Sequence, residues 1–494
     1  MKQTSNKSLS LCSIKINGKA ISEYKIYSTA DASPNRGVGN ILVGACSRRL
    51  ADNILNKFSG ETVEVVTEMG DEKGAYIVLE PKSMDYTHYR TELRDGNLYV
   101  YGSYKSCYEF LDYFVKQGIK DVDITEGFEG DIDKPKLYTK EELWYVLQKA
   151  QNEPNRVIIG QESVGNIKTP YAGSIDLFRA GTEGYDPGIV GVDLGWAGIC
   201  LYRDMRGEKK ANDELKSQQF CEMVEYAEMG GFFTVGSHFH NPNREGYAHK
   251  GNNGGLRFEA MGFLGKDDAF RDLVTPGTEF NKNFQDELDA CIEYLKYFKE
   301  IGLPVIYRPF HEMTQNTFWW AMVQKFPDGT KYYIEKECFV NLWKYVYKAF
   351  TEAGLDNLIW HFCPDFFAID CLSGYPGDEY CDLVGSDWYT GGVGKLEIIE
   401  HCGLRTLENL MKVGKPIGIG EFGQWDVHES SLDYVKDFRE IFNQGYQLSY
   451  AMVWTVNHSF LKLGKGKEAM DSGVFICREE LVDWFAEARR ELNK

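Results

Sequence analysis

The sequence predicts an α/β fold, a (β/α)8 TIM barrel preceded by a small α/β domain. Its 494 residues exceed the usual size of one hydrophobic core. From residue 157 onward, short apolar runs alternate with amphipathic helical stretches, as repeated β-α units require. The eight runs are VIIGQE, GIVGVDLG, FFTVGSHF, PVIYRPF, LIWHFCP, DLVGSDWY, PIGIGEFG and YAMVWTV. No G-x-G-x-x-G segment follows the first run, which favours a closed barrel over an open doubly wound sheet.

Residues 1–150 have a different pattern and are predicted to form a small accessory domain. Its expected strands are residues 13–27, 61–66, 74–80 and 97–103, and its expected helices are residues 40–58 and 107–118. The polar stretch QNEPN is expected to mark the domain boundary, so that residues 151–494 form the catalytic barrel. We assign no catalysis to the first domain, because candidate catalytic groups are not concentrated there.

Between the apolar runs, three long stretches have the periodicity of amphipathic helices. They are DELKSQQFCEMVEYAEM, FQDELDACIEYLKYFKEIG and ECFVNLWKYVYKAFTEAG. Each returns the chain to the start of another parallel strand, as the barrel requires.

Composition and charge narrow the range of partners. Lys and Arg number 55 against 74 Asp and Glu, and the net charge of -19 repels phosphate backbones and anionic membrane surfaces. We therefore expect no nucleic-acid partner and no membrane partner. Aromatic residues make up 14% of the chain, which suits a surface that binds the flat apolar faces of sugar rings.

The cysteines and the N-terminus bear on the compartment. The 12 cysteines include no C-x-x-C pair, which disfavours a zinc ribbon or a disulfide scaffold. The opening residues lack the apolar run of a signal peptide, and no apolar stretch is long enough to span a bilayer. The protein is expected in the cytoplasm if Met1 is its native start, or outside the cell if an export signal has been removed.

Polar residues stand at the C-terminal end of each apolar run, where barrel active sites are built. They are Gln161, Glu162, Asp193, His238, Arg308, His311, Glu312, His361, Asp387, Tyr389, Glu421 and Trp454. Two of them, Glu312 after the fourth run and Glu421 after the seventh, would face each other across the barrel mouth. Retaining hydrolysis of a glycosidic bond requires two carboxyl groups about 5–5.5 Å apart, one as acid and one as nucleophile. The pattern therefore favours a glycosidase.

Several motifs together resemble glycoside hydrolase family 26, which belongs to a retaining (β/α)8 clan and is best known for β-mannanases. The segments RPFHEM, FWW, DWY, IGEFG and VWT carry this resemblance, which covers roughly residues 157–493. It implies that Glu312 is the acid/base and Glu421 the nucleophile, in a reaction that uses no metal and no cofactor. It also implies a β-linked polysaccharide or oligosaccharide substrate, with β-1,4-mannan as the leading candidate.

The resemblance further implies a set of substrate-binding residues. They are His238, Asn241, Arg308, His311, Trp319, Trp320, Asp387, Tyr389 and Trp454. Arg308 is expected to orient carboxylates, above all Glu421. Trp454 is expected to lie beneath the sugar at the cleavage point.

One position departs from the family pattern. Members often carry Trp-Phe-Trp-Trp three residues after His-Glu-Met, whereas Thr317 stands here at the first of these Trp positions. A missing stacking platform beside the acid/base changes the neighbouring subsite. Mixed-linkage β-glucan and β-xylan therefore stay open as alternative substrates, and so does exo rather than endo action.

Two further function classes compete with a glycosidase. His238 and His240 form a His-x-His element at a strand end, the first part of a zinc-dependent amidohydrolase site, to which His361 could add a ligand. Such sites also need a His on the sixth strand and an Asp on the eighth, where this chain has Asp387 and Trp454. A sugar-binding protein without activity is the other alternative, and the presence of both glutamates disfavours it.

Overall fold

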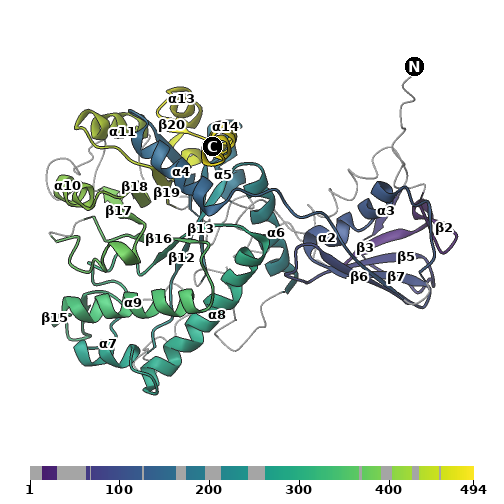
Figure 1. Ribbon diagram of the computed structural model, residues 1–494, viewed down its shortest axis with the longest axis horizontal. Coiled ribbons are helices and arrows are strands. Elements are labelled where there is room, and N and C mark those ends of the chain that lie inside the picture. Colours follow the sequence, from purple (N-terminus) through teal and green to yellow (C-terminus); the bar gives the residue numbers. More distant parts are fainter. Residues whose placement is uncertain are drawn as a thin grey trace. The chain divides into compact units, whose positions relative to one another are not determined.

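The computed structural model describes the chain in segments, which fold into two compact units (Figure 1). The described residues are 14–29, 63–66, 68–124, 127–162, 174–194, 213–242, 262–366, 370–390, 403–424, 433–454 and 458–494. The first unit contains the described residues up to Lys136 together with residues 213–225, and the second contains the others.

The first unit is built on a six-stranded sheet with the order β4-β3-β5-β7-β6-β9. Its strands are β3 (Lys25–Ser28), β4 (Glu64–Val66), β5 (Tyr76–Pro81), β6 (His88–Arg94), β7 (Asn97–Gly102) and β9 (Phe128–Asp131). A second, three-stranded sheet consists of β1 (Lys15–Ile16), β2 (Lys19–Ala20) and β8 (Asp121–Val122). Helix α2 (Tyr104–Glu109) packs against β5, β6 and β7, and α3 (Asp112–Gln117) follows it. The unit is therefore α/β, as expected.

The predictions for this unit hold in part. In its described residues, each of the four expected strand regions contains strand, but a turn at Asn17–Gly18 and a short 3-10 helix, Ile21–Glu23, divide the first into β1, β2 and β3. Strands β6 and β9 were not predicted, because the polar residues of β6 hide its alternating burial. The expected helix at 107–118 is divided into α2 and α3. The expected helix at residues 40–58 lies outside the described part of the chain.

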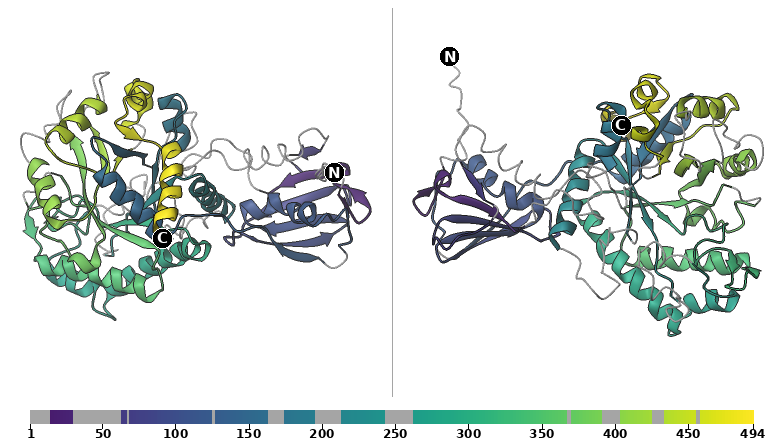
Figure 2. Two further views of the ribbon diagram at one scale, coloured as in Figure 1. Left: turned by 45° about the horizontal axis from the view of Figure 1, so that its top comes forward. Right: turned by 180° about the vertical axis from the view of Figure 1, so that it is seen from behind.

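The second unit contains a closed barrel of eight parallel strands, as predicted (Figure 2). The strands are β10 (Val157–Gln161), β11 (Ile189–Asp193), β12 (Phe232–Ser237), β13 (Val305–Pro309), β16 (Leu358–Phe362), β17 (Leu383–Thr390), β18 (Ile417–Gln424) and β19 (Tyr450–Val453). Each strand pairs in parallel with its neighbours, and the pairing of β10 with β11 closes the ring. A short extra strand, β20 (Phe475–Ile476), pairs with β10. All eight predicted runs are barrel strands.

Helices connect successive strands and surround the barrel (Figure 2). They are α4 (Lys140–Asn152), α5 (Ser174–Thr182), α6 (Asp213–Glu228), α7 (Asp267–Leu273), α8 (Glu279–Ile301), α9 (Lys336–Glu352), α10 (Gly403–Val413), α11 (Tyr434–Asn443), α12 (Phe460–Leu463), α13 (Gly466–Asp471) and α14 (Arg478–Leu492). A hairpin of β14 (Val323–Lys325) and β15 (Lys331–Tyr333) lies between β13 and α9. The three predicted long helices correspond to α6, α8 and α9.

Helix α8 shows why the sequence forms these elements. The hydroxyl of Thr278 caps its first turn by accepting a hydrogen bond from the N–H of Asn281, and Gly302 ends it in the left-handed conformation. Between these caps, apolar residues recur at helical spacing and face the barrel, among them Phe284, Leu288 and Leu295.

The division into units differs from the expected boundary at residue 150. Helix α4 belongs to the second unit, where the ring of Tyr138 stacks on that of Phe485 at 4.4 Å and Lys149 pairs with Glu487. In the first unit, Ser217 of α6 donates a hydrogen bond to the carbonyl of Ser83 at 2.6 Å. The division at residue 150 as a statement of domain organisation stays a prediction.

Two expectations about the whole chain can be compared with the described residues. Within the described ranges, no helix has both the length and the apolar character that a membrane span needs. All eight cysteines in these ranges are buried and unbridged, in keeping with a role as small core residues.

Candidate active site

The polar residues that end the barrel strands gather at one face of the barrel. Arg308 belongs to β13, Asp387 and Tyr389 to β17, and Glu421 to β18. Because β17 and β18 pair in parallel, Asp387 lies directly beside Glu421. The four side chains come from strand ends that meet at the C-terminal face, where barrel enzymes place their chemistry.

Glu421 is held by two donors. Nη2 of Arg308 donates to its Oε1 at 2.7 Å, and the hydroxyl of Tyr389 donates to its Oε2 at 2.7 Å. Both carboxylate oxygens are thus bound in a site where Glu421 is only 4% exposed. Charge-assisted hydrogen bonds of this kind stabilise the ionised carboxylate. The oxygens are fixed in direction, as a nucleophile requires.

Both carboxylate oxygens of Asp387 accept hydrogen bonds from side chains of the protein. Nη1 of Arg308 donates to Oδ2 of Asp387 at 2.8 Å, and the thiol of Cys363 donates to Oδ1 at 3.1 Å. Asp387 is completely buried, which disfavours direct contact with substrate, and its role in binding substrate stays a prediction. Burial raises its pKa, and the positive charge of Arg308 opposes that rise. Its position fixes the guanidinium of Arg308.

A glycine makes room for this ion pair. A side chain at Gly420 would bring its Cβ to 2.5 Å from Oδ1 of Asp387 and 3.0 Å from Cδ of Arg308. The first contact is too close for real atoms, and the second is tighter than most. The Gly-Glu order at the end of β18 therefore lets Glu421 stand beside the buried pair without a clash.

Glu312 lies in an unusual backbone conformation. It has a φ of 54° and Phe310 has a φ of 53°, in the left-handed region that non-glycine residues rarely adopt. The N–H of Glu312 donates to the carbonyl of Cys363 at 2.9 Å, which anchors the turn to the end of β16. Such conformations cost about 1–3 kcal/mol each and persist where the surrounding structure enforces them. No residue pattern in the sequence predicted this turn.

The environment of Glu312 favours its protonated form. Its side chain is buried, and this burial is the main reason that its pKa is raised well above the usual value. The negative charges of Glu421, Asp387 and Asp365 add to the effect, whereas Arg308 opposes it. The charge of Glu421 thus acts on Glu312, and the two carboxyl groups belong to one site.

Two histidines lie next to this pair. Nε2 of His311 is 3.7 Å from Oε1 of Glu421, and the rings of His311 and His238 meet edge to face at 4.5 Å. Burial, and after it the charge of Arg308, lower the pKa of His311 and keep the imidazole neutral. Nδ1 of His238 is bound to Oδ2 of Asp193 at 2.6 Å, which leaves its Nε2 on the opposite edge of the ring.

The tryptophans of the FWW segment are core residues. Trp319 and Trp320 are completely buried, and their indole N–H groups donate to the carbonyls of Phe239 and His311 at 2.7 and 2.8 Å. The ring of Phe318 stacks on Trp320 at 4.5 Å. An indole without an exposed face is poorly placed to stack on a sugar, so this burial disfavours substrate binding by Trp319 and Trp320, which stays a prediction. They support the backbone that carries His311.

Two other predicted residues are placed near the strand ends. Nδ2 of Asn241 donates to the carbonyl of Phe263 at 3.1 Å, and the residue is buried. Trp454 follows β19, and its backbone N–H donates to the carbonyl of Phe422 at 2.9 Å. Its half-buried side chain keeps part of the indole accessible.

The His-x-His element does not form a metal site in this geometry. His238 is directed to Asp193 on β11, whereas Nδ1 of His240 is bound to Glu287 on helix α8 at 2.9 Å. The third imidazole, that of His361, is bound to the hydroxyl of Tyr450 at 2.8 Å. Among the described residues, these three imidazoles are not part of any group with the spacing of metal ligands, which disfavours the amidohydrolase alternative.

Within the described ranges, two other groups of side chains have the spacing of metal ligands. One is His311, Asp387 and Glu421. There the guanidinium of Arg308 lies between the two carboxylates, so an arginine already supplies the positive charge that an ion would bring.

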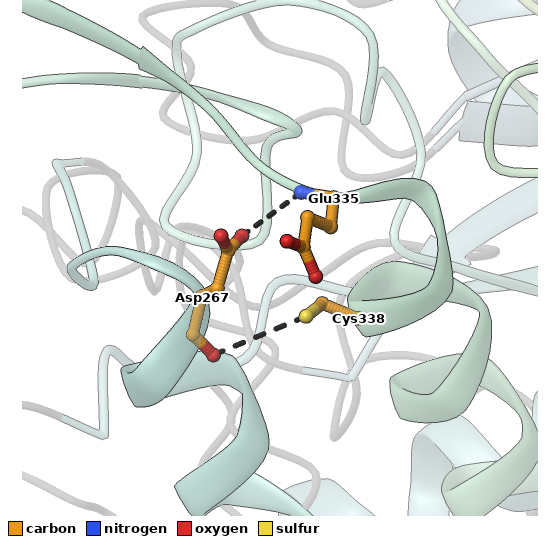
Figure 3. Close-up of side chains that lie close together, drawn as sticks. All are labelled: Asp267, Glu335 and Cys338. Carbon is orange, nitrogen blue, oxygen red and sulfur yellow. Dashed lines mark hydrogen bonds between the residues drawn. The ribbon is translucent and has the colours of Figure 1, made fainter.

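The second group is Asp267, Glu335 and Cys338, away from the barrel mouth. Figure 3 shows the carboxylate of Asp267 directed at the backbone N–H of Glu335, from which it accepts a hydrogen bond at 2.9 Å. Asp267 also accepts one from the hydroxyl of Tyr332 at 2.6 Å, and Arg271 binds Glu335. These bonds connect the start of α7 to the start of α9, which is a structural role.

Known proteins match the barrel unit. The profile described as Glycosyl hydrolase family 26 matches residues 132–471, well over half of the chain. The chain belongs to glycoside hydrolase family 26. This confirms the resemblance read from the RPFHEM, FWW, DWY, IGEFG and VWT segments, and it identifies the protein as a glycosidase.

Individual relatives of this family 26 member match between about half and two thirds of its length. A mannan endo-1,4-beta-mannosidase of Bacillus subtilis is 26% identical over 323 residues, which are 64% of this chain and 79% of that protein. Mannan endo-1,4-beta-mannosidase A and B of Caldalkalibacillus mannanilyticus is 24% identical over 258 residues, 52% of this chain and 46% of that protein. The structure of Bacillus subtilis mannanase man26 shares the fold, with a TM-score of 0.51, 22% identity, and coverage of 68% of this chain and 91% of that one.

The structure adds residues that the sequence did not single out for this family 26 site. Asp193 positions His238, although it was recognised only as a polar strand end. His458 packs edge to face on Tyr389, with 5.7 Å between ring centroids, and burial lowers its pKa to about 4. A Cβ at Gly423 would lie 2.5 Å from Nδ1 of His458. A Gly beside the strand end was the available signal, since it marks a close approach by another group.

Proposed function

We propose that this family 26 enzyme is a retaining β-glycosidase that cleaves β-1,4-mannan through a glycosyl-enzyme intermediate. The observation that carries the proposal is the coupled carboxyl pair of the barrel mouth. Glu312 is buried with a raised pKa, whereas both oxygens of Glu421 accept hydrogen bonds, from Arg308 and Tyr389. One protonated and one ionised carboxyl group are what retaining hydrolysis needs.

Glu312 is proposed as the acid/base. In the first step its proton goes to the glycosidic oxygen as the bond to the anomeric carbon breaks, so the departing sugar leaves as a neutral alcohol. In the second step the resulting carboxylate takes a proton from water, which attacks the anomeric carbon. The burial that raises the pKa of Glu312 keeps the proton available near neutral pH.

Glu421 is proposed as the nucleophile. One of its oxygens attacks the anomeric carbon on the face opposite to the leaving group and forms a glycosyl ester, which water then hydrolyses. Arg308 and Tyr389 keep the carboxylate oriented at 2.7 Å each, and Asp387 keeps Arg308 in place. Because carboxyl groups and water supply every step, the reaction uses no cofactor.

Direct contact with the sugar is proposed for four residues at the barrel mouth. His238, held by Asp193, and the neutral His311 beside Glu421 have ring nitrogens that can bind hydroxyl groups. Asn241 carries an amide oxygen, and Trp454 carries a half-buried indole that suits the apolar face of a pyranose. The partner is thus a β-linked polysaccharide or oligosaccharide.

The substrate rests on the names of relatives, which are mannan endo-1,4-beta-mannosidases. The test is a screen of purified enzyme against mannan, mixed-linkage β-glucan and β-xylan oligosaccharides, with the first-formed anomer followed by NMR. We expect the highest kcat/KM on β-1,4-mannan oligosaccharides and β-anomeric products. A higher kcat/KM on glucan or xylan oligosaccharides would contradict mannan as the substrate. α-Anomeric products would overturn the retaining mechanism.

A further inference from the structure

A chain of polar side chains lies beside Glu312. Oγ1 of Thr317 donates to Oε1 of Gln315 at 3.0 Å, and Nε2 of Gln315 donates to Oδ1 of Asp365 at 2.7 Å. The backbone N–H of Asp365 donates to Oγ1 of Thr314 at 2.9 Å. The loop after β13 is thereby tied to the loop after β16 by side chains rather than by apolar packing.

These hydrogen-bonded side chains lie beside Glu312, the proposed acid, and not beside the nucleophile Glu421. The backbone N–H of Gln315 donates to the carbonyl of Glu312 at 3.0 Å, so both lie in one turn. Asp365 follows the strand end at which Cys363 accepts the N–H of Glu312. Its charge also contributes to the raised pKa of Glu312. Arg308 and Tyr389, in contrast, bind the nucleophile Glu421.

The orientation of the Gln315 amide is fixed by its two partners. The carboxylate of Asp365 can only accept, so the NH2 group must face it, and the oxygen must then face the hydroxyl of Thr317. An amide has two N–H donors and two acceptor lone pairs, of which these bonds use one each. Gln315 and Thr317 are only half-buried, so the unused donor and acceptor can reach a ligand.

From this geometry we propose that Gln315, oriented by Asp365 and Thr317, determines specificity by hydrogen bonding to hydroxyl groups of the sugar that leaves from Glu312. The inference rests on the proposed function and deepens it. The group protonated by Glu312 is the oxygen of the departing sugar, so that sugar occupies the space next to the acid. Thr317 presents a hydroxyl group at a position where a Trp would present a flat face for stacking. The departing sugar would therefore be recognised there by hydrogen bonds and not by stacking.

The test distinguishes contacts with the departing sugar from contacts with the rest of the substrate, by comparing two substrates that differ only in the leaving group. A β-manno-oligosaccharide and a dinitrophenyl β-manno-oligosaccharide share the same glycone, but only the first places a sugar next to Glu312. In Gln315→Ala, we expect kcat/KM on the oligosaccharide to fall about threefold to tenfold, the worth of one neutral hydrogen bond, and that on the aryl glycoside to stay within about twofold. Thr317→Val keeps the side-chain shape and should show a smaller loss of the same kind.

The matched control is Gln285→Ala on helix α8. Gln285 is also half-buried and makes two side-chain hydrogen bonds, to Asp289 and Tyr345, but lies outside the site. Gln285→Ala should leave kcat/KM on the oligosaccharide and on the aryl glycoside at the parent's values.

Equal losses on both substrates in Gln315→Ala would overturn the proposal, because the residue would then affect the shared glycone or the fold, and so would unchanged rates on both. The dependence of kcat/KM on pH, measured with the oligosaccharide, separates a contact with the departing sugar from an effect on the proton of Glu312. The proposal expects the loss of kcat/KM at high pH to have the same midpoint in Gln315→Ala as in the parent, and a shifted midpoint would overturn it. Failure of the parent enzyme on every β-glycan would instead overturn the proposed function itself.

Discussion

Nη2 of Arg308 donates to Oε1 of Glu421 across 2.7 Å, with both side chains buried at the barrel mouth. The other arm of the guanidinium binds Asp387, so one cation neutralises two carboxylates that no solvent screens. A buried charge that loses its partner is far more costly than a lost surface ion pair. The same contact therefore supports both the fold and the ionised state of the proposed nucleophile.

Replacing Arg308 by Leu should destabilise the protein strongly. The change leaves Asp387 and Glu421 buried without a cation, and such a loss typically costs about 3–5 kcal/mol in the free energy of unfolding. Urea titration of parent and variant measures the difference. The matched control is Arg271→Leu, which breaks exposed pairs with Asp268 and Glu335 and should unfold close to the parent.

The cost of Arg308→Leu should also depend on pH. Burial already raises the pKa of Asp387, and removal of Arg308 takes away the charge that opposes this rise. When the pKa of a carboxyl group is raised in the folded state, the protein tolerates the protonated group. The free energy of unfolding then falls as pH rises through the folded pKa, because the buried group becomes charged. The destabilisation should therefore shrink toward acidic pH. A loss that is small, or equal at acidic and neutral pH, would contradict this account of the ion pair.

Tyr389→Phe should lower turnover without unfolding the enzyme. It removes the hydrogen bond to Oε2 of Glu421, and hydrogen bonds to charged groups correspond to about a tenfold to hundredfold change in kcat/KM. Tyr332→Phe is the control, since Tyr332 also donates to a carboxylate, that of Asp267, but makes no hydrogen bond to Glu312 or Glu421. If both variants had the parent's kcat/KM, Tyr389 would not hold the nucleophile.

The barrel could be predicted from the sequence because its signal is local. Each strand is a short apolar run with polar residues at or just after its end, so both the strands and the positions of Glu312 and Glu421 follow from the order of residues. Strand β6 was missed because its residues, HYRTELR, have the polar composition of a loop. Only its pairing with β7 and β9 defines it as a strand.

The orientation of side chains could not be predicted in the same way. Trp319 and Trp320 follow the acid in sequence, but the left-handed turn at Phe310 and Glu312 directs the chain so that both indoles enter the core. Asp387 stands at a strand end as a ligand-binding residue would, yet Arg308 and Cys363 occupy its oxygens. These outcomes depend on contacts between distant segments, which a pattern of residues does not contain.

Glu421→Gln should lower the pKa of Glu312. After burial, the negative charge of Glu421 is the largest cause of the raised pKa of Glu312, and the amide removes it. In the parent, kcat/KM should fall as pH rises through the raised pKa, because the acid loses its proton. Titration of the Glu312 carboxyl by NMR in parent and Glu421→Gln measures the shift directly. An unchanged pKa would mean that the two carboxyl groups are not coupled.

Thr317→Trp should change the choice of sugar. An indole at this position adds a stacking face worth about 0.5–1.5 kcal/mol, and it also removes the hydroxyl that binds Gln315. We expect kcat/KM on linear β-mannan oligosaccharides to change about threefold to tenfold relative to mixed-linkage glucan and xylan oligosaccharides. Thr317→Ser, which keeps the hydroxyl, is the control. If a folded Thr317→Trp variant shows the parent's ratio of rates, Thr317 does not line a subsite.

The central claim is that Glu312 donates the proton and Glu421 attacks, and azide rescue of the two alanine variants tests it most directly. On a dinitrophenyl β-glycoside, whose leaving group needs no proton, Glu312→Ala should still form the glycosyl-enzyme, and azide should restore turnover by giving a β-glycosyl azide. Glu421→Ala should stay inactive on the same substrate without azide. Equal loss by Glu312→Ala on activated and unactivated substrates, with no rescue by azide, would contradict the assignment of the two glutamates.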